Sequence, residues 1–234
     1  MFDPHPAPSI RERSYGWRRA LVQIAGAALF SFPFAANVAA QPAAAPVKVV
    51  ALGDSLTAGY GLPEAQGFVP RLQTALAAKA IAAEVQNAGV SGDTMSDGLA
   101  RLDWSVPPGT NAVILELGAN DMLRGMAPQI TRKALDAILR RLTERHIAVL
   151  LCGMRAAPNL GAEYRQAFEP IYPQLAAKYG VLLYPFFLDG VAAHLSLTQR
   201  DGLHPNAAGV DVIVAHILPQ VEELVVRAKA QHPS

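Results

Sequence analysis

Residues 47–56 read VKVVALGDSL, an aliphatic and β-branched run that meets the polar turn Gly53-Asp54-Ser55. The run predicts a buried strand, and the turn after it predicts the start of a helix. The same alternation recurs along the chain. We expect further strands at 83–87, 112–117, 148–152 and 181–186, and helices at 68–81, 128–145 and 205–228. Alternation of this kind predicts an α/β domain with a parallel sheet covered by helices on both faces.

Two of the predicted helices have distinct local signals. In residues 128–145, apolar side chains recur four apart on one face, at Ile130, Ala134, Ile138 and Leu142. The last helix is predicted to begin at Pro205, because the fixed φ of proline suits the first helical position. No internal repeat is visible in residues 47–234, which we therefore read as a single domain.

Polar segments follow the predicted strands or precede the last helix, and the carboxyl ends of parallel strands are where such sheets bind ligands. The segments are Gly53-Asp54-Ser55-Leu56, Asn87-Ala88-Gly89-Val90-Ser91-Gly92, Gly118-Ala119-Asn120-Asp121 and Asp201-Gly202-Leu203-His204. Together they would bring a hydroxyl, glycine amides, a carboxamide, a carboxylate and an imidazole to one edge.

Each of these residues also has an ordinary structural interpretation. Ser55 could simply cap a helix, and Asn120 could stabilise a turn through its own backbone. Gly89 could serve only to permit a positive φ. Asp201 and His204 are three residues apart, so the carboxylate can hold the imidazole in one tautomer and leave the other nitrogen free as a base. The combination of all these groups at predicted ligand-side positions favours a catalytic site.

With these blocks in place, the sequence resembles the SGNH (GDSL) hydrolases. The longer stretches ALGDSLTAGYGLP, NAGVSGDT, LELGANDMLRG, YPFFLDGVA and DGLHPNAAG are similar to the bacterial branch that contains thioesterase/lysophospholipase and arylesterase enzymes. The resemblance covers residues 47–225. It implies a flavodoxin-like three-layer α/β/α sandwich with a five-stranded parallel sheet.

The resemblance also implies a mechanism. Ser55 would be the nucleophile, His204 the base and Asp201 the residue that orients it. An oxyanion hole would consist of the N–H groups of Ser55 and Gly89 and the side chain of Asn120. The substrate would be a small acyl ester or thioester, and no metal or organic cofactor would be required.

Apolar residues after two strands could line an acyl groove, although packing inside the protein would explain them equally well. They are Met122, Leu123, Met154, Pro158 and Leu160, in a segment around 122–126 and a loop at 154–164. Two other functions remain open. One is a carbohydrate O-acetyl esterase, and the other is a non-catalytic flavodoxin-like binding module.

The amino-terminal residues have a different composition. Basic residues including Arg18 and Arg19 precede an uncharged run from Ala20 to Ala40, and Val38-Ala39-Ala40 suits a cleavage site. This order predicts a signal peptide at 1–40 and a short linker at 41–46, and hence a periplasmic or secreted protein. A membrane anchor is the alternative, and the arginine pair leaves twin-arginine export open beside the general route.

The overall composition excludes several classes of protein. The chain has 234 residues, 51 % hydrophobic and 17 % charged, with a net charge of +1, which excludes a disordered chain and argues against a nucleic-acid partner. The single cysteine, Cys152, excludes an intramolecular disulfide. We expect the mature protein to be a monomer with no stable membrane insertion.

Overall fold

The computed structural model describes residues 45–231. Five parallel strands form one sheet in the order β2-β1-β3-β4-β5. They are β1 (Val47–Gly53), β2 (Ala83–Gly89), β3 (Ala112–Glu116), β4 (Ala148–Cys152) and β5 (Leu182–Tyr184). The first strand lies inside the sheet, between β2 and β3, and the chain then adds strands outward on either side. This arrangement confirms the predicted five-stranded parallel sheet.

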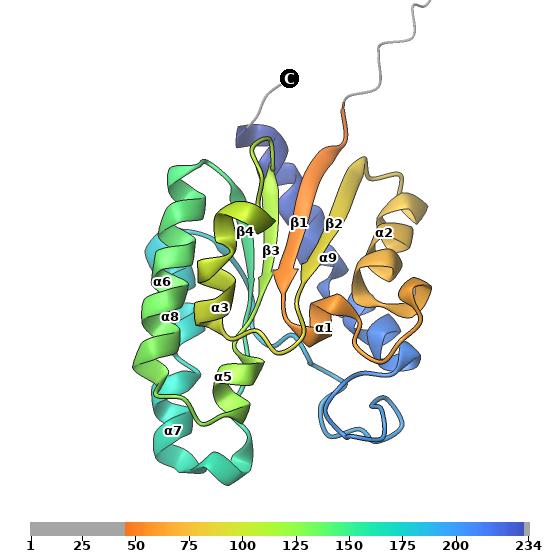
Figure 1. The fold of residues 1–234 in the computed structure, drawn as a ribbon. Coiled ribbons are helices and arrows are strands. Elements are labelled where there is room, and N and C mark those ends of the chain that lie inside the picture. The colour runs from red at the N-terminus through yellow and green to blue at the C-terminus, as the bar shows by residue number, and fades with distance from the viewer. Residues whose placement is uncertain (1–44, 232–234) are drawn as a thin grey trace, which may run out of the picture. The chain divides into compact units, whose positions relative to one another are not determined.

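Helices cover both faces of the sheet (Figure 1). On one side, α2 (Phe68–Ala78) packs against α9 (Ala207–Gln231), and α9 also contacts the central strands. The other side carries α3 (Met95–Ala100), α4 (Leu102–Ser105), α6 (Pro128–Glu144), α7 (Gly161–Phe168) and α8 (Ile171–Tyr179). The three layers confirm the predicted α/β/α sandwich.

The strands end almost level with one another. Gly53 at the end of β1 pairs with Gly89 on one side and with Glu116 on the other, and Glu116 pairs with Cys152. Two short helices leave this edge, α1 (Ser55–Ala58) after β1 and α5 (Ala119–Leu123) after β3. In Figure 1 the edge lies at the lower end of the sheet, beside both helices and the long segment that precedes α9.

The core consists of aliphatic side chains from the sheet and the inner faces of the helices. Every residue of β3 and β4 is buried, as expected for strands covered on both faces. Ala134, Ile138 and Leu142 of α6 are buried as predicted, but Ile130 is 47 % exposed. Ile130 lies in the first turn of α6.

Several predicted boundaries are corrected. The last helix begins at Ala207 and not at Pro205, because Asn206 Oδ1 accepts the N–H of Gly209 and so caps the helix. Pro205 instead forms an isolated antiparallel bridge with Thr198. The expected strand at 181–186 is only three residues long, and the expected loop at 154–164 contains the 3₁₀ turn η2 (Pro158–Leu160) and the beginning of α7. A further 3₁₀ turn, η1 (Glu64–Gln66), precedes α2.

The predicted signal peptide at 1–40 and most of the predicted linker lie outside the described residues. Between residues 45 and 231, none of the helices has both the length and the apolar character needed to cross a bilayer.

Candidate active site

Three side chains from two distant parts of the chain form one hydrogen-bonded line. Ser55 Oγ lies 2.9 Å from His204 Nε2, and His204 Nδ1 lies 2.6 Å from Asp201 Oδ2. With Nδ1–H donated to the carboxylate, Nε2 is left as the acceptor for the serine proton. The structure thus brings together the three residues that the sequence predicts as nucleophile, base and orienting acid.

The Asp201 carboxylate is fixed by its own turn. Its Oδ1 accepts the backbone N–H groups of Leu203 and His204, at 2.9 and 3.1 Å. The bond to the His204 ring and these backbone bonds lower the pKa of Asp201 to about 2. Asp201 therefore stays ionised well into the acid range, and it can stabilise an imidazolium on His204 at any pH near neutrality.

The ring of Tyr60 packs against the ring of His204. Its ring centroid lies 4.6 Å from that of His204, and the two planes are tilted by 39°. Gln199 Nε2 donates to the Tyr60 carbonyl, which ties the loop after α1 to the segment that carries the histidine. No periodicity or motif in the sequence indicates this contact, because it joins two loops.

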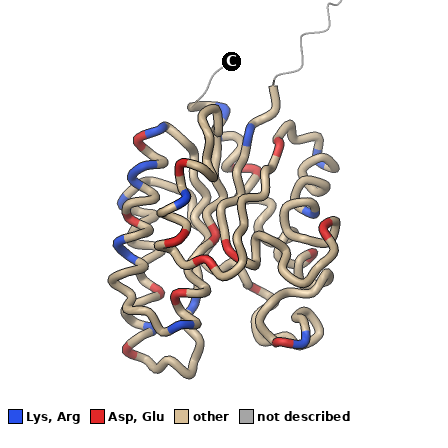
Figure 2. The backbone as a smooth tube through the Cα atoms, in the orientation of Figure 1, with Lys and Arg blue, Asp and Glu red and all other residues tan. Residues whose placement is uncertain are grey.

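Ser55 owes its position to the residue before it. Asp54, and not Ser55, caps α1, because Asp54 Oδ1 accepts the N–H of Leu56 at 3.0 Å. The serine hydroxyl is thereby free to face His204. Asp54 is fully buried, and this burial raises its pKa to about 6. Figure 2 shows acidic positions gathered at the lower ends of the central strands, the edge to which Asp54 belongs.

Asn120, in α5, is held by two acceptors. Its Nδ2 donates to the backbone oxygen of Asp93 at 3.0 Å and to Asp54 Oδ2 at 3.2 Å. Asn120 is only partly buried, and it lines the same cavity as Ser55 and His204. Both N–H groups of this amide therefore have acceptors within the protein, which hold Asn120 at the mouth of the site, and its role as an oxyanion donor stays a prediction.

Gly89, whose N–H the sequence predicts as an oxyanion donor, packs closely against α1. Its N–H donates to Asn87 Oδ1 at 2.9 Å, and a Cβ at this position would lie 2.3 Å from the backbone nitrogen of Ala58. Gly89 is therefore a packing glycine that lets α1 approach β2, and its N–H is already occupied. The glycine better placed near Asn120 is Gly92, which adjoins Asp93 and has a φ of +89°. In the sequence, Gly92 is the second glycine of the stretch NAGVSGDT, and this is the signal that could have identified it.

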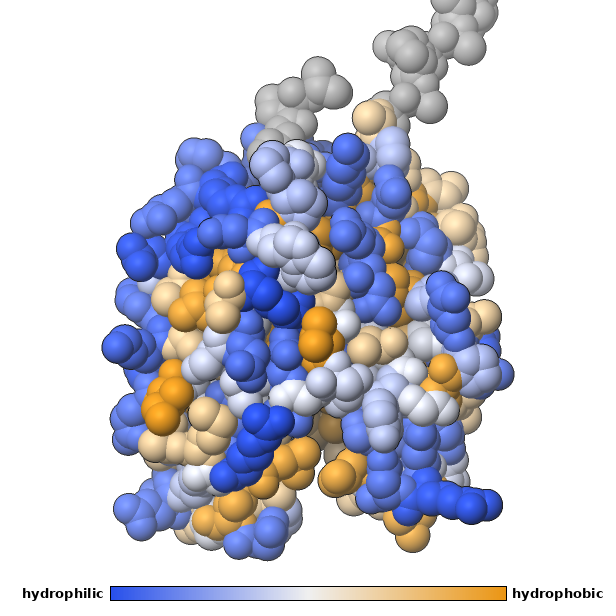
Figure 3. Space-filling view, in the orientation of Figure 1, coloured by the Kyte–Doolittle hydropathy of each residue, from blue (hydrophilic) through white to orange (hydrophobic). Residues whose placement is uncertain are grey.

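An apolar cavity of about 100 Å³ adjoins these polar groups. Met122, Leu123 and Met154 line it as the sequence predicts, together with Leu56, Ala119, Leu188 and Leu203. Pro158 and Leu160, which were also expected, lie in η2 and do not line this cavity. In Figure 3 the surface is hollowed at the lower end, with hydrophobic side chains on both sides of the hollow.

Beneath the site lies a buried acid that the sequence reasoning missed. Glu116 at the end of β3 is fully buried, and its Oε2 accepts the hydroxyl of Thr57 at 2.8 Å. Burial, reinforced by the nearby Asp54 charge, raises its pKa well above the usual value for glutamate. An acidic residue within the apolar run AVILEL was the signal. Among residues 45–231, no cluster of three or more His, Cys, Asp or Glu is arranged to hold a metal ion.

Comparison with known proteins agrees with this geometry. Residues 51–212 match the GDSL-like lipase/acylhydrolase family. The chain is 39 % identical over 186 residues to Esterase TesA of Pseudomonas aeruginosa (79 % of this chain, 92 % of that protein). It is 38 % identical over 184 residues to thioesterase 1/protease 1/lysophospholipase L1 of Escherichia coli K12 (78 % and 87 %).

A solved structure is also similar in fold and sequence. The SGNH-hydrolase family esterase AlinE4 has a TM-score of 0.65 and 45 % identity, over 76 % of this chain and 96 % of that chain. The family match at residues 51–212 includes every predicted site segment. The chain therefore belongs to the GDSL-like lipase/acylhydrolase family, which is the family of SGNH hydrolases that its motifs resemble.

Proposed function

We propose that Ser55 is the nucleophile with which this member of the family hydrolyses carboxylic esters, and that it acts with His204 and Asp201. The observation that carries the proposal is the continuous line of hydrogen bonds from Ser55 Oγ through the His204 ring to Asp201. Isolated serine, histidine and aspartate residues have no reason to align in this way, whereas acyl transfer requires it.

The geometry supports the usual order of proton transfers. As Ser55 Oγ attacks the acyl carbon, its proton passes to His204 Nε2, and the carbonyl oxygen takes up the negative charge. His204 then gives the proton to the departing alcohol or thiol, which leaves an acyl group on Ser55. A water molecule that loses its proton to His204 releases the acid and restores the serine.

The developing oxyanion needs fixed donors. Ser55, in the first turn of α1, and Asn120 both line the cavity, which supports the Ser55 N–H and Asn120 Nδ2 as two of these donors. Asn120 Nδ2 would exchange its 3.2 Å bond to Asp54 for one to the oxyanion. We assign the third donor to the N–H of Gly92 in place of Gly89. Two observations support this choice: the Gly89 N–H is bonded to Asn87, and Gly92 lies in the loop whose Asp93 carbonyl contacts Asn120.

Covalent labelling tests the nucleophile directly. A fluorophosphonate probe should label the wild-type protein and should fail to label Ser55→Ala. Ser91→Ala is the matched control, since Ser91 is an exposed serine of the same sheet edge, and it should be labelled normally. Unchanged labelling of Ser55→Ala, or undiminished ester turnover by that variant, would contradict the proposal.

For the acyl group, we propose a short chain. The cavity beside Ser55 measures about 100 Å³, less than the roughly 300–1,000 Å³ of sites that enclose drug-sized ligands. A longer acyl chain would extend out of the cavity along the side chains of Leu123 and Leu203, each 50 % exposed. A series of p-nitrophenyl esters from acetate to palmitate should show the highest kcat/KM for the short members, and a maximum at palmitate would contradict this.

A matched pair of leucine variants tests the course of longer chains. Leu123→Ala should lower kcat/KM for the longer esters and spare the acetate. Leu195→Ala is the control, because Leu195 is 83 % exposed and does not line the cavity. A uniform effect of Leu123→Ala on every ester would indicate a structural role for that residue.

We also propose that residues 1–40 are an export signal and that residues 47–234 are the hydrolase domain. The uncharged run after the arginine pair and the small residues before Gln41 support this. Amino-terminal sequencing of the protein recovered from the periplasm or medium of its host should begin at Gln41. A protein that keeps its leader in the membrane fraction would indicate an anchor.

A further inference from the structure

Arg101, between α3 and α4, has its side chain largely enclosed, with 15 % exposed. The guanidinium donates four hydrogen bonds, and two of the acceptors are carbonyl oxygens at the ends of strands. Nη2 donates to Gly53 O at 2.9 Å, at the end of β1, and Nη1 donates to Ala88 O at 2.9 Å, near the end of β2. Nε reaches Asp93 Oδ2 at 2.5 Å, and Nη1 also reaches Ser105 Oγ at 2.8 Å.

These acceptors belong to the segments that hold the Asn120 amide. Asp93 offers its backbone oxygen to Asn120 Nδ2 while its carboxylate is bound by Arg101. Gly53, whose carbonyl Arg101 also binds, directly precedes Asp54, the second acceptor of the Asn120 amide. Arg101 therefore binds one of the two residues that orient Asn120, Asp93, and the residue directly before the other, Asp54.

The Gly53 carbonyl also binds the loop that contains Gly92. Gly53 O accepts a second bond from the N–H of Val90, at 3.0 Å, so the loop from Val90 to Asp93 is tied to the end of β1 as well as to Arg101. Gly92 lies within this loop, and Ser55 follows Gly53 by two residues. A planar guanidinium with five N–H donors can serve such a divergent set of acceptors, whereas the compact ammonium of lysine cannot reach all of them.

From this geometry we propose that Arg101 is a positioning residue for the oxyanion site: it fixes the strand ends and the loop that carry Ser55, Gly92 and the acceptors of Asn120. The inference rests on the proposed function, because it assumes that these donors stabilise the transition state. Arg101 itself touches neither the cavity nor the substrate. It acts by holding donors at the place where charge develops, and a displacement of about 1 Å of such donors can cost about 10²-fold in rate.

The test is a double-mutant cycle between Arg101 and Asn120, measured as kcat and KM on a short p-nitrophenyl ester. Arg101→Ala should lower kcat by about 10²-fold, with KM within about threefold of wild type, because only transition-state stabilisation is lost. In the Asn120→Ala background the same substitution should cost less than about tenfold, since the amide whose acceptor segments Arg101 binds is already gone and only its effect on the other donors remains.

Two further variants separate positioning from folding. Arg101→Lys keeps the charge beside Asp93, so it should fold even if Arg101→Ala does not, and it should show the same loss in kcat without a change in KM. Arg145→Ala is the matched control, because Arg145 Nη2 also donates to backbone carbonyls, those of Val106 and Pro107, before β3 at the opposite end of the sheet. It should lower the thermal midpoint and leave kcat unchanged.

Losses that multiply in the double variant, a full kcat in Arg101→Lys, or an effect on KM alone would each overturn the positioning role. None of these results would touch the nucleophile, which fails only if Ser55→Ala keeps its turnover or its labelling. The two proposals can thus fail separately.

Discussion

Ser55 Oγ and His204 Nε2 lie 2.9 Å apart although 149 positions of the chain separate the two residues. The serine sits at the first turn after β1, and the histidine sits just before α9, which packs back along the sheet next to that strand. The contact therefore depends on the long carboxyl-terminal helix and on the segment before it. Any substitution that moves this segment is expected to affect catalysis before it affects the core.

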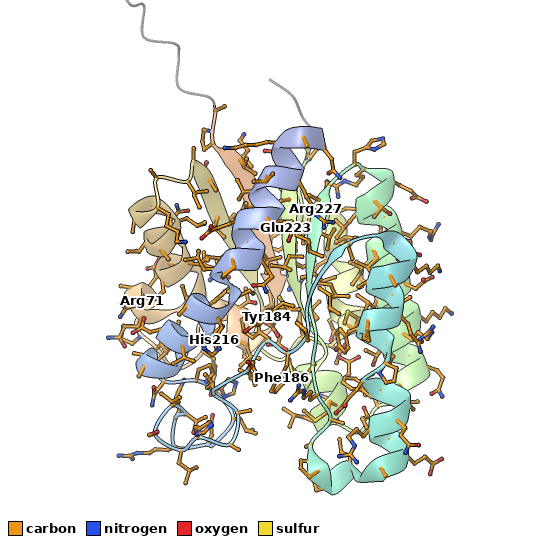
Figure 4. All side chains as sticks on the ribbon, turned by 180° about the vertical axis from the view of Figure 1, so that it is seen from behind. Arg71, Tyr184, Phe186, His216, Glu223 and Arg227 are labelled. Atoms are coloured by element: carbon orange, nitrogen blue, oxygen red, sulfur yellow. The ribbon has the colours of Figure 1, made fainter. Side chains whose placement is uncertain are left out.

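Asp201→Asn should lower kcat by about 10³–10⁴-fold. An asparagine amide can donate to His204 Nδ1 and so favour the wrong tautomer, in which Nε2 carries a proton and cannot accept one from Ser55. Ester turnover at neutral pH measures the effect. Asp189→Asn is the control, because Asp189 Oδ2 lies 3.9 Å from His216 of α9 and neither residue lines the cavity. Figure 4 shows His216 on α9. Equal losses in both variants would contradict the role of Asp201.

Asn120→Ala should lower kcat by about 10²–10³-fold with little change in KM, the signature of one lost oxyanion donor. Steady-state kinetics on a short ester provide the measurement. Asn111→Ala removes a different backbone-binding amide, whose Oδ1 accepts the N–H of Lys48 at the other end of the sheet, and it should keep the wild-type kcat. An effect of Asn120→Ala confined to KM would make Asn120 a substrate-binding residue.

Gly89→Ala should destabilise the fold. The new Cβ would lie 2.3 Å from the backbone nitrogen of Ala58, so α1 or β2 would have to shift, and overpacking of this kind costs about 1–3 kcal/mol. Thermal unfolding measures the loss. Ala introduced at Gly109, where a Cβ would meet nothing within 4 Å, bears only the strain of a positive φ and should lose less. A Gly89→Ala protein as stable as wild type would refute the close packing.

Glu116→Gln should stabilise the protein at neutral pH and have no such effect near pH 4. Burial raises the pKa of Glu116 in the folded protein, so the folded state favours the neutral acid. Stability is then lost as the pH rises from the unfolded pKa toward the folded one, at no more than about 1.4 kcal/mol per pH unit. Glutamine, which is always neutral, avoids this loss.

Thermal midpoints of the wild type and of Glu116→Gln, compared from pH 4 to pH 8, test the titration of Glu116. The gap between the two midpoints should widen with pH. Glu84→Gln, at an exposed position of β2, should show no such trend. A Glu116→Gln protein that is less stable than wild type at every pH would show that the carboxylate form is the one the fold requires.

Local sequence patterns were enough to predict the sheet. β4 has the predicted bounds, Ala148–Cys152, because an apolar run of five residues is long enough for a buried strand and too short for a helix. The strand at Leu182–Tyr184 is shorter than expected: its pairing with β4 ends at Cys152 and Tyr184, after which the Tyr184 carbonyl accepts the N–H of Gly153. Where strands end depends on such neighbours and not on the local pattern.

By itself, the sequence determined the alternation of strands and helices, and with it the edge at which Ser55, Asn120, Asp201 and His204 had to gather. Only the tertiary structure decided which partners the amides near that edge bind. Nothing in the local sequence separates Gly89 from Gly92. In the structure, the Gly89 N–H is bonded to Asn87 and the residue packs against α1, whereas Gly92 adjoins Asp93, whose carbonyl binds Asn120. The tertiary structure also brings Arg101 to the carbonyl of Gly53 and Glu116 to the hydroxyl of Thr57, close to the site. The reason is physical: periodicity records which side chains avoid water, whereas the direction of an N–H group depends on which partners the fold brings within 3 Å of it.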